Sequence, residues 1–265
     1  MQVQSKHMIS SSQAKFIRSL RQKKYRDLHR VFLVEGEKMV LELANAWPES
    51  GLRIQEIFAS PEWIEAKASW LLSRQIRFSE TSYAEIKKVS NLVTPQAVIA
   101  LVSIPTRHFS LEAILHSPVL AFESIRDPGN LGTIIRTADW FGIEHIVCTP
   151  DSTDLFNPKV VQSTMGAIAR VQVHYQELKP LLAGKELKKK KVFGTYLDGE
   201  NIYQTRLDPD PLILFGNESH GLSGALEPYI HHKISIPCFS QGATRSESLN
   251  VASSVAVVCS ELRRG

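Results

Sequence analysis

The sequence predicts an α/β protein with two domains, the second of which is built around a parallel sheet. Short apolar runs alternate with stretches of helical periodicity along most of the 265 residues. In the second half these runs are apolar at nearly every position, which is typical of parallel strands that helices cover on both faces. A chain of this length usually folds as about two domains. We therefore expect a small α/β domain followed by a larger one.

The first 30 residues are predicted to form a basic helical arm. Ile17, Leu20 and Leu28 fall on one apolar stripe of a helix. The arm has a single acidic residue, Asp27, and its eight basic residues are Lys6, Lys15, Arg18, Arg21, Lys23, Lys24, Arg26 and Arg30. Such a segment is typical of nucleic-acid binding, and a solvated helix without a partner explains the charge equally well.

Residues 31–103 are predicted to form the small α/β domain. Strands are expected at 31–34, 54–59 and 97–102, and helices at 37–46, 61–72 and 82–89. This region contains no recognisable catalytic constellation. A connection at 104–117 then leads into the second domain, which is expected to begin at residue 118.

The second domain shows the same alternation more strongly. Buried strands are expected at 119–125, 145–149, 171–173, 192–197, 212–216 and 234–237. Helices are expected at 131–141, 158–168 and 247–262. The run Lys188–Lys191 is most simply a solvated basic turn that precedes a strand, and contact with phosphate is the alternative.

Several classes of protein are disfavoured by what the sequence lacks. No apolar run approaches the length that spans a bilayer, and the first residues have no apolar core typical of a signal peptide. The three cysteines are widely spaced, which favours a reducing, cytoplasmic location over a disulfide framework or a metal site. No Rossmann fingerprint, P-loop or nucleophile elbow is present.

Three polar loops follow predicted strands, at the edge where open α/β sheets bind ligands. In the first, Asn130 is expected to cap a helix whose free N–H groups favour an anion, and Arg136 lies about one turn further along. In the second, Gly216 would let a ligand approach the backbone, and Glu218 follows it. In the third, two polar residues, Ser248 and Asn250, begin an apolar helix, where burying them would cost free energy unless they form hydrogen bonds, and this cost suggests a function. Each loop taken alone is also explained by an ordinary capped helix or exposed turn.

The three loops contain the motifs DPGNLGTIIRTA at 127–138, LFGNESHGL at 214–222, and ISIP at 234–237 with SLNVA at 248–252. In this order and at these separations they resemble the SpoU/TrmH family of RNA ribose 2′-O-methyltransferases. FLVEGEKMVLEL at 32–43 and QAVIALV at 96–102 are similar to the family's small N-terminal RNA-binding domain. The resemblance implies a trefoil-knotted, parallel-sheet methyltransferase domain and a homodimer packed through that domain.

The resemblance also implies S-adenosyl-L-methionine as the methyl donor, with no metal ion. The positions that match the family's catalytic motifs are Asn130, Arg136, Glu218, Ser248 and Asn250. The positions that match its cofactor-binding backbone are Gly216, Ile236 and Leu249, with Thr195, Tyr196 and Leu197 alongside. RNA contacts are expected from Lys15, Arg18, Arg21, Lys23 and Lys24 of the arm and from Arg245 in the long loop 238–247.

The expected function is transfer of a methyl group to a ribose 2′-hydroxyl of RNA, with ribosomal RNA favoured by the appended N-terminal domain. Transfer RNA is the alternative substrate for the same chemistry. An RNA-binding protein that has lost activity is a third interpretation, and the intact motif residues argue against it. In the expected reaction Arg136 holds a phosphate and stabilises the developing alkoxide rather than acting as a base, because free arginine keeps its proton.

Overall fold

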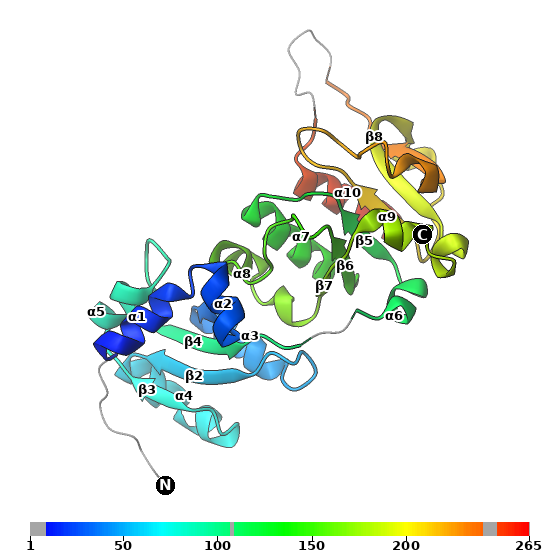
Figure 1. Cartoon of the computed structure of the whole chain (residues 1–265). Coiled ribbons are helices and arrows are strands. Elements are labelled where there is room, and N and C mark those ends of the chain that lie inside the picture. Colours follow the sequence, from blue (N-terminus) through cyan, green and yellow to red (C-terminus); the bar gives the residue numbers. More distant parts are fainter. Residues whose placement is uncertain (1–8, 107–108, 241–247, 265) are drawn as a thin grey trace. The chain divides into compact units, whose positions relative to one another are not determined.

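The computed structural model describes residues 9–106, 109–240 and 248–264 of the chain (Figure 1). The chain divides into two units. The N-terminal unit contains the described residues up to 106 together with Phe156–Ala169, and the C-terminal unit contains 109–155 and the described residues from 170 onward. Segment 156–169 belongs with the N-terminal unit, although it lies within the predicted second domain. The predicted domain boundaries stay a prediction.

The N-terminal unit is a four-stranded sheet in the order β1-β4-β2-β3, in which β4 is antiparallel to both of its neighbours and β3 is parallel to β2. The strands are β1 Val31–Glu35, β2 Ile54–Ala59, β3 Phe78–Glu80 and β4 Val98–Ser103. The helical segments are α1 Ser11–Ser19, α2 Lys23–His29, α3 Glu37–Asn45, α4 Pro61–Ser73, α5 Tyr83–Val89, α8 Pro158–Thr164 and η1 Ala167–Ala169. The alternation expected over 31–103 is therefore present.

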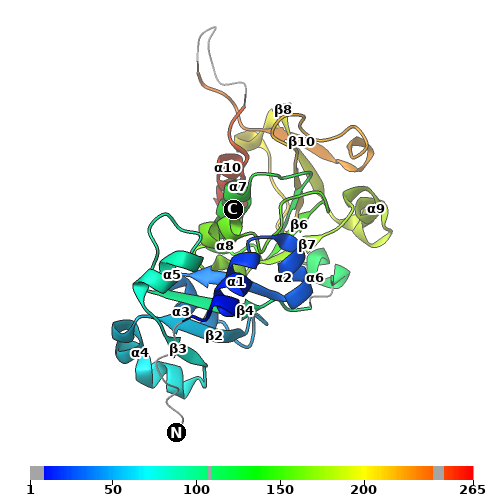
Figure 2. The same cartoon turned by 60° about the vertical axis from the view of Figure 1, so that its left-hand side comes forward.

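The basic arm differs from the single helix expected, because it forms two short helices that pack into the N-terminal unit (Figure 2). Ile17 and Leu20 belong to the same buried cluster as residues of β1, β4 and α5. Leu28, which was expected on the same stripe, is 71% exposed. The first helix ends at Ser19 and the second begins at Lys23. In the turn between them, the carbonyl oxygens of Leu20 and Arg21 accept hydrogen bonds of 2.8 and 2.9 Å from the buried Arg26. The arm is therefore part of the core of this unit.

The C-terminal unit contains a six-stranded sheet in the order β10-β8-β9-β5-β6-β7, and every neighbouring pair is parallel. Its strands are β5 Val119–Phe122, β6 His145–Cys148, β7 Gln172–Tyr175, β8 Val192–Asn201, β9 Leu212–Phe215 and β10 His232–Ser235. Its helical segments are α6 Leu111–Leu115, α7 Pro128–Trp140, α9 Leu178–Ala183, η2 Glu186–Lys189, η3 Ile202–Gln204, η4 Glu227–Tyr229 and α10 Val251–Arg264. The expected parallel sheet is confirmed. The trefoil threading stays an expectation from the family resemblance.

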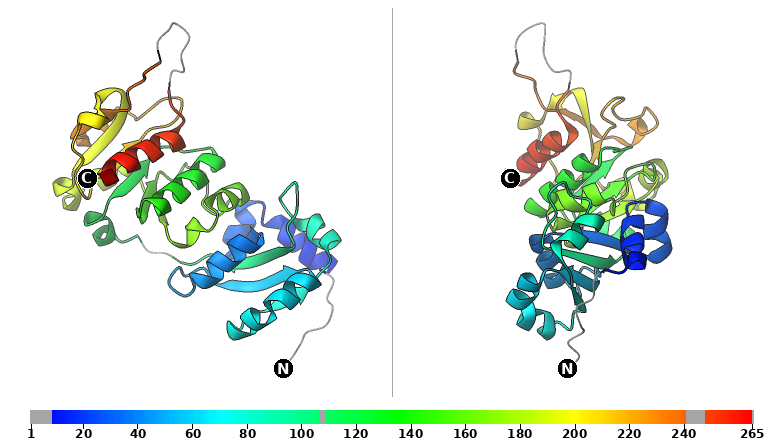
Figure 3. Two further views of the ribbon diagram at one scale, coloured as in Figure 1. Left: turned by 180° about the vertical axis from the view of Figure 1, so that it is seen from behind. Right: turned by 90° about the vertical axis from the view of Figure 1, so that its left-hand side faces the viewer.

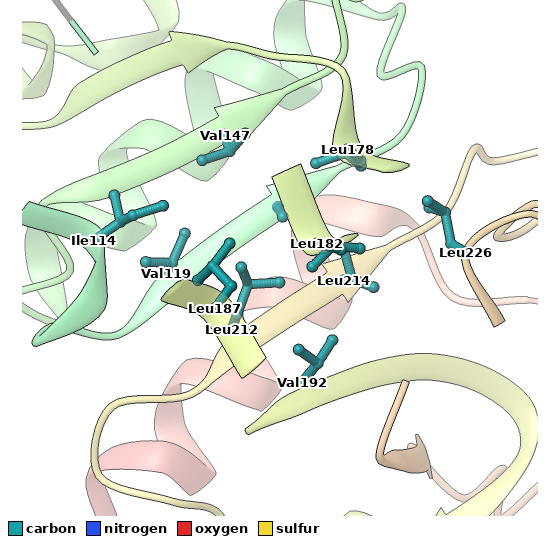
Figure 4. Close-up of a cluster of buried hydrophobic side chains, with 11 residues drawn as sticks. Ile114, Val119, Val147, Leu178, Leu182, Leu187, Val192, Leu212, Leu214 and Leu226 are labelled. Carbon is teal, nitrogen blue, oxygen red and sulfur yellow. The ribbon is translucent and has the colours of Figure 1, made fainter. Parts of the chain in front are cut away.

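Apolar side chains from the central strands hold this sheet against the short helices on one of its faces. Figure 4 shows this cluster, in which Val119, Val192 and Leu214 come from three strands, and Leu182 comes from α9. All four residues of β5, β6 and β9 are buried. Strands that are buried along their whole length appear in the sequence as nearly continuous apolar runs, and for this reason their positions could be predicted from the sequence.

Helices α7 and α10 lie side by side in the C-terminal unit, as the green and red helices of Figure 3 show. Arg263 of α10 donates to the carbonyl oxygens of Phe141 and Gly142, each at 2.8 Å, and so satisfies the carboxyl end of α7. At its other end α7 begins at Pro128, with Asp127 as the cap. The expectation that Asn130 caps this helix is therefore wrong, because Asn130 already lies in the first turn. None of the described helices is long and apolar enough to cross a membrane.

The run Lys188–Lys191 is not uniformly solvated as expected, because Lys190 is buried and only 6% of its surface is exposed. Its ammonium group donates to the carbonyl oxygens of Leu115, Ser117 and Asp210 at 3.3, 2.8 and 2.9 Å. Burial lowers the pKa of Lys190 to about 8, so the side chain remains protonated at pH 7. Three donors thus match three carbonyl acceptors that the turns before β5 and β9 leave without a strand partner.

Replacing Lys190 with methionine is expected to destabilise the fold by about 2 kcal/mol, because three carbonyl groups lose the buried ammonium that donates to them. Urea denaturation of Lys190→Met at pH 7 measures this loss. Lys189→Met is the matched control, since Lys189 is exposed, and its free energy of unfolding should stay within about 0.5 kcal/mol of the parent. Equal stabilities of the two variants would contradict a structural role for the buried ammonium.

Candidate active site

The three predicted loops meet at the side chain of Asn130. The loops follow β5, β9 and β10, whose carboxyl ends lie on the same edge of the parallel sheet. Asn130 donates through Nδ2 to Oε1 of Glu218 in the second loop. Its Oδ1 accepts a hydrogen bond of 3.1 Å from Nδ2 of Asn250 in the third loop. A single amide therefore links all three motifs.

The position of Asn130 is fixed by the start of α7. Asp127 accepts a hydrogen bond of 2.8 Å from the backbone N–H of Asn130, and Pro128 occupies the first helical position, where no N–H is needed. The side-chain amide of Asn130 is thereby left to face the other loops. The structure thus gives Asp127 the capping role that the sequence suggested for Asn130.

Asn250 is fixed in a similar way at the start of α10. Its Oδ1 accepts the backbone N–H of Ala252 at 2.9 Å, so the side chain caps the helix while its Nδ2 reaches Asn130. Both Ser248 and Asn250 are exposed. The cost of burying them, which had suggested a function, therefore does not arise, although both residues do border the site.

A cavity of about 800 Å³ lies beside these loops. Its walls include every position expected to bind the cofactor, which are Thr195, Tyr196, Leu197, Gly216, Ile236 and Leu249. They also include three positions expected to be catalytic, which are Glu218, Ser248 and Asn250. Residues of η3 and α10, among them Ile202 and Val258, complete the apolar part of the wall.

The second loop is shaped by two glycines. Asn217 and Gly221 exchange backbone hydrogen bonds of 3.0 and 2.8 Å, which closes a tight turn directly after β9. Gly221 has φ +69°, which favours glycine. A Cβ on Gly216 would collide with the backbone of Gly221 and Leu222. Gly216 is therefore required for the backbone of this loop to close against the cavity.

Asn130 does not line the cavity, but it hydrogen-bonds to Glu218 and Asn250, which do. Arg136 is the other expected catalytic residue that does not line it. It lies on α7, is exposed, and is absent from the residues that line the cavity. Thr133 and Trp140 share its side of the helix, because residues three and four apart lie on one face. Trp140 is 84% exposed. Arg136 thus lies on an exposed face of α7 and does not line the cavity that Glu218 borders.

Sequence reasoning missed Asn217, which connects the second loop to the first. Its Nδ2 donates to the carbonyl oxygen of Ser124 at 3.0 Å, and its Oδ1 accepts the N–H of Ser219 at 2.9 Å. Its position within the motif LFGNESHGL was visible in the sequence, but a loop asparagine has many possible partners. Glu123 adds a second link, because its carboxylate accepts the N–H of Ser223 at 2.7 Å.

The residues expected to bind RNA on the arm are exposed on α1 and α2 or between them. Some already have partners within the chain: Arg21 donates to the carbonyl oxygen of Ser90 at 2.7 Å, and Lys23 pairs with Asp27 at 2.7 Å. Lys15, Arg18 and Lys24 are exposed as well. Arg245 lies outside the described residues.

Comparison with known proteins agrees with this geometry. A family model described as the SpoU rRNA methylase family matches residues 117–260, which is more than half of the chain. The chain belongs to the SpoU rRNA methylase family. A second model, described as an MRM3-like substrate binding domain, matches residues 11–100.

Individual relatives in this family match almost the whole chain. The 23S rRNA (guanosine(2553)-2′-O)-methyltransferase RlmP of Bacillus subtilis is 30% identical, over 93% of this chain and 94% of its own. The 23S rRNA (guanosine-2′-O-)-methyltransferase RlmB of Neisseria meningitidis is 27% identical, over 88% and 90%. The structure of an rRNA methyltransferase from Sinorhizobium meliloti with AdoMet bound has 29% identity and a TM-score of 0.80, and the match covers 96% of each chain.

The cavity fits S-adenosylmethionine. Its volume lies within the range of cofactor pockets, which is roughly 300–1,000 Å³. The glycine at 216 removes the side chain that would block close approach to the loop backbone, and the wall combines apolar side chains with polar backbone. The backbone of Gly216, Ile236 and Leu249 would hold the cofactor there. The bound cofactor would supply an activated methyl group on its sulfonium.

Substituting Gly216 with alanine is expected to weaken S-adenosylmethionine binding by about tenfold, because the added methyl group forces the backbone at 216 apart from that of Gly221 and Leu222 and so distorts the second loop. Isothermal titration calorimetry measures this affinity. Gly224→Ala is the matched control: a Cβ there meets open space, and its affinity should stay within about twofold of the parent. Parental affinity in Gly216→Ala would show that this loop does not form the cofactor pocket.

Proposed function

We propose that the protein transfers a methyl group from S-adenosylmethionine to a ribose 2′-hydroxyl of ribosomal RNA. The observation that carries this proposal is the Asn130 amide, which joins Glu218 and Asn250 at the border of the cofactor cavity. The methyl donor and the polar residues of all three family motifs thereby come together. The family membership of the chain supports the same reaction.

The chain's own residues have to orient the ribose and manage its proton. A hydroxyl is a poor nucleophile until its proton leaves. Arg136 keeps its own proton, so its role is to hold the adjacent phosphate and to stabilise the negative charge that develops on the 2′-oxygen. Asn130 and Glu218 position the sugar beside the cavity. The proton passes to water or to an RNA phosphate oxygen as the oxygen–carbon bond forms and the carbon–sulfur bond breaks.

A homodimer would bring Arg136 to this reaction. The face of α7 that carries Arg136 also exposes Trp140, and aromatic residues are enriched at interfaces between proteins. In the proposed dimer, this face lies against a second copy, so that Arg136 serves the cavity of the partner. Each site would then combine Glu218 of one chain with Arg136 of the other.

Ribosomal RNA is favoured over transfer RNA. RlmP and RlmB, which align along most of both chains, are named as 23S rRNA methyltransferases. Residues 11–100, which include most of the basic arm, match a model described as an MRM3-like substrate binding domain. We further propose that Lys15, Arg18 and Lys24 contact RNA, and that the protein works in the cytoplasm, which its three free cysteines favour. The arm's role has to be probed by charge substitution, because truncation would remove Ile17 and Leu20 from the core.

Mixing two inactive variants tests the shared site. Arg136→Ala and Glu218→Ala are each expected to lose methyl transfer by at least about 100-fold, because each lacks one half of the site. Refolded or co-expressed mixtures contain heterodimers in which one site is complete and the other lacks both residues. We therefore expect each mixed dimer to reach up to the activity of one parental site, which is about half that of a parental dimer. Transfer of labelled methyl groups to unmodified ribosomal RNA measures it.

Absence of rescue in the mixture, with both variants folded and dimeric, would contradict the shared site. Near-parental turnover by Arg136→Ala alone would contradict the role of Arg136. Arg170→Ala is a control for loss of an exposed arginine, since Arg170 pairs with Asp139 on the surface at 2.8 Å and does not line the cavity.

A further inference from the structure

Asp151, which follows β6, is hydrogen-bonded to the first active-site loop. Its Oδ2 accepts a hydrogen bond of 2.6 Å from the hydroxyl of Ser124, and its Oδ1 accepts one of 2.6 Å from the hydroxyl of Thr149. Thr149 in turn accepts the backbone N–H of Ser124 at 2.8 Å. The hydrogen bond from Ser124 is the largest of the effects that lower the pKa of Asp151, so this carboxylate is ionised at neutral pH.

These bonds stabilise an unusual backbone conformation at Ser124. Its φ of +55° lies in the left-handed region, which is unfavourable for a residue with a side chain. All three polar groups of Ser124 have partners: its N–H binds Thr149, its hydroxyl binds Asp151, and its carbonyl accepts from Asn217. The turn at Ser124 sets the direction in which the chain continues to Asp127 and α7.

Arg126 is the cation that this turn presents to solvent. One of its N–H groups donates to Oδ2 of Asp151 at 3.1 Å, while 71% of its side chain stays exposed. It precedes Asn130 by four residues, so the two Cα atoms are at most about 14 Å apart. A guanidinium has five donors in a planar fork, and the single bond to Asp151 leaves donors available for a phosphate.

We propose that Arg126 contacts the RNA backbone next to the target nucleotide and that Asp151 is the positioning residue that aims it. This inference rests on the proposed methyl transfer to RNA and adds a contact outside the three family motifs. The Asp151 carboxylate accepts hydrogen bonds from Ser124 in the left-handed turn and from the guanidinium, so it restrains the arginine before RNA arrives. Preordering an arginine reduces the conformational entropy that binding would otherwise cost.

Steady-state methyl transfer to transcribed, unmodified ribosomal RNA tests the contact made by Arg126. For Arg126→Ala we expect the KM for RNA to rise about tenfold, with kcat and the affinity for S-adenosylmethionine within about twofold of the parent. The slope of log KM against log salt should fall by about one, as for the loss of one phosphate contact. Lys189→Ala is the matched control, because Lys189 is exposed on the turn that precedes β8, at the opposite edge of the sheet.

A double-mutant cycle tests the positioning role of Asp151. Asp151→Asn should also raise the KM for RNA without changing kcat, because the arginine loses its ionic partner. In the background of Arg126→Ala, however, Asp151→Asn should raise the KM by a clearly smaller factor than it does in the parent, because only its effect through the Ser124 turn remains. If Asp151→Asn lowers the melting temperature, Ser124→Ala takes its place in the cycle, since it removes one hydroxyl donor and leaves the charges unchanged.

The proposal is overturned if Arg126→Ala behaves like Lys189→Ala, or if the effects of the two substitutions on KM multiply. Filter binding of the same RNA without cofactor separates this inference from the proposed function. If the parent protein binds RNA but transfers no methyl group, the proposed function fails. The relative RNA affinities of Arg126→Ala and Lys189→Ala then still decide whether Arg126 is a contact.

Discussion

The site depends on the hydrogen bonds made by one half-buried amide. Asn130 donates to Glu218 and accepts from Asn250, so that loops separated by up to 120 residues in sequence are joined side chain to side chain. An amide suits this position because it offers a donor and an acceptor at the same time. An ionised acid only accepts hydrogen bonds, so it could not donate to Glu218. The hydroxyl of the RNA ribose has to be presented at this junction, next to the methyl donor.

The fold makes that junction possible through strand direction. All six strands of the C-terminal unit run parallel, so the loops after β5, β9 and β10 emerge at one edge. Local features then set each loop: Asp127 caps α7, Asn250 caps α10, and Gly216 allows the second loop to close on Gly221. Residues with no chemical role, such as Asp151 and Asn217, hold the first loop in place. Positioning of the site is therefore distributed over several separate hydrogen bonds.

Much of the fold could be predicted from sequence because buried parallel strands are continuous apolar runs. The same reasoning placed the three loops at the ligand-binding edge. The motifs named Asn130, Glu218 and Asn250, but they could not show that these side chains bond to one another. That information depends on tertiary geometry that no spacing encodes. The left-handed turn at Ser124 was likewise hidden, because serine gives no signal of positive φ.

Charge was the least reliable guide. Lys190 was expected in solvent with its neighbours, and it is instead buried against three carbonyl oxygens, because a lysine run records composition and not accessibility. The arm was expected to be one helix, but the chain turns between Leu20 and Lys23 and its apolar side chains enter the core. The helix that carries Arg136 was predicted correctly. The exposure of Arg136, however, depends on which face of α7 packs against the rest of the unit. These differences arise from packing that the local sequence does not determine.

The most direct test of the junction is the turnover of Asn130→Ala, measured as methyl transfer to unmodified ribosomal RNA at saturating cofactor. The backbone N–H of Asn130 still caps against Asp127 in this variant, so α7 and the cofactor cavity should be retained. The account predicts a fall in kcat of about 100-fold, with the affinity for S-adenosylmethionine within about twofold of the parent. A kcat close to that of the parent would contradict it, because the three loops would then reach their working positions without the amide that joins them.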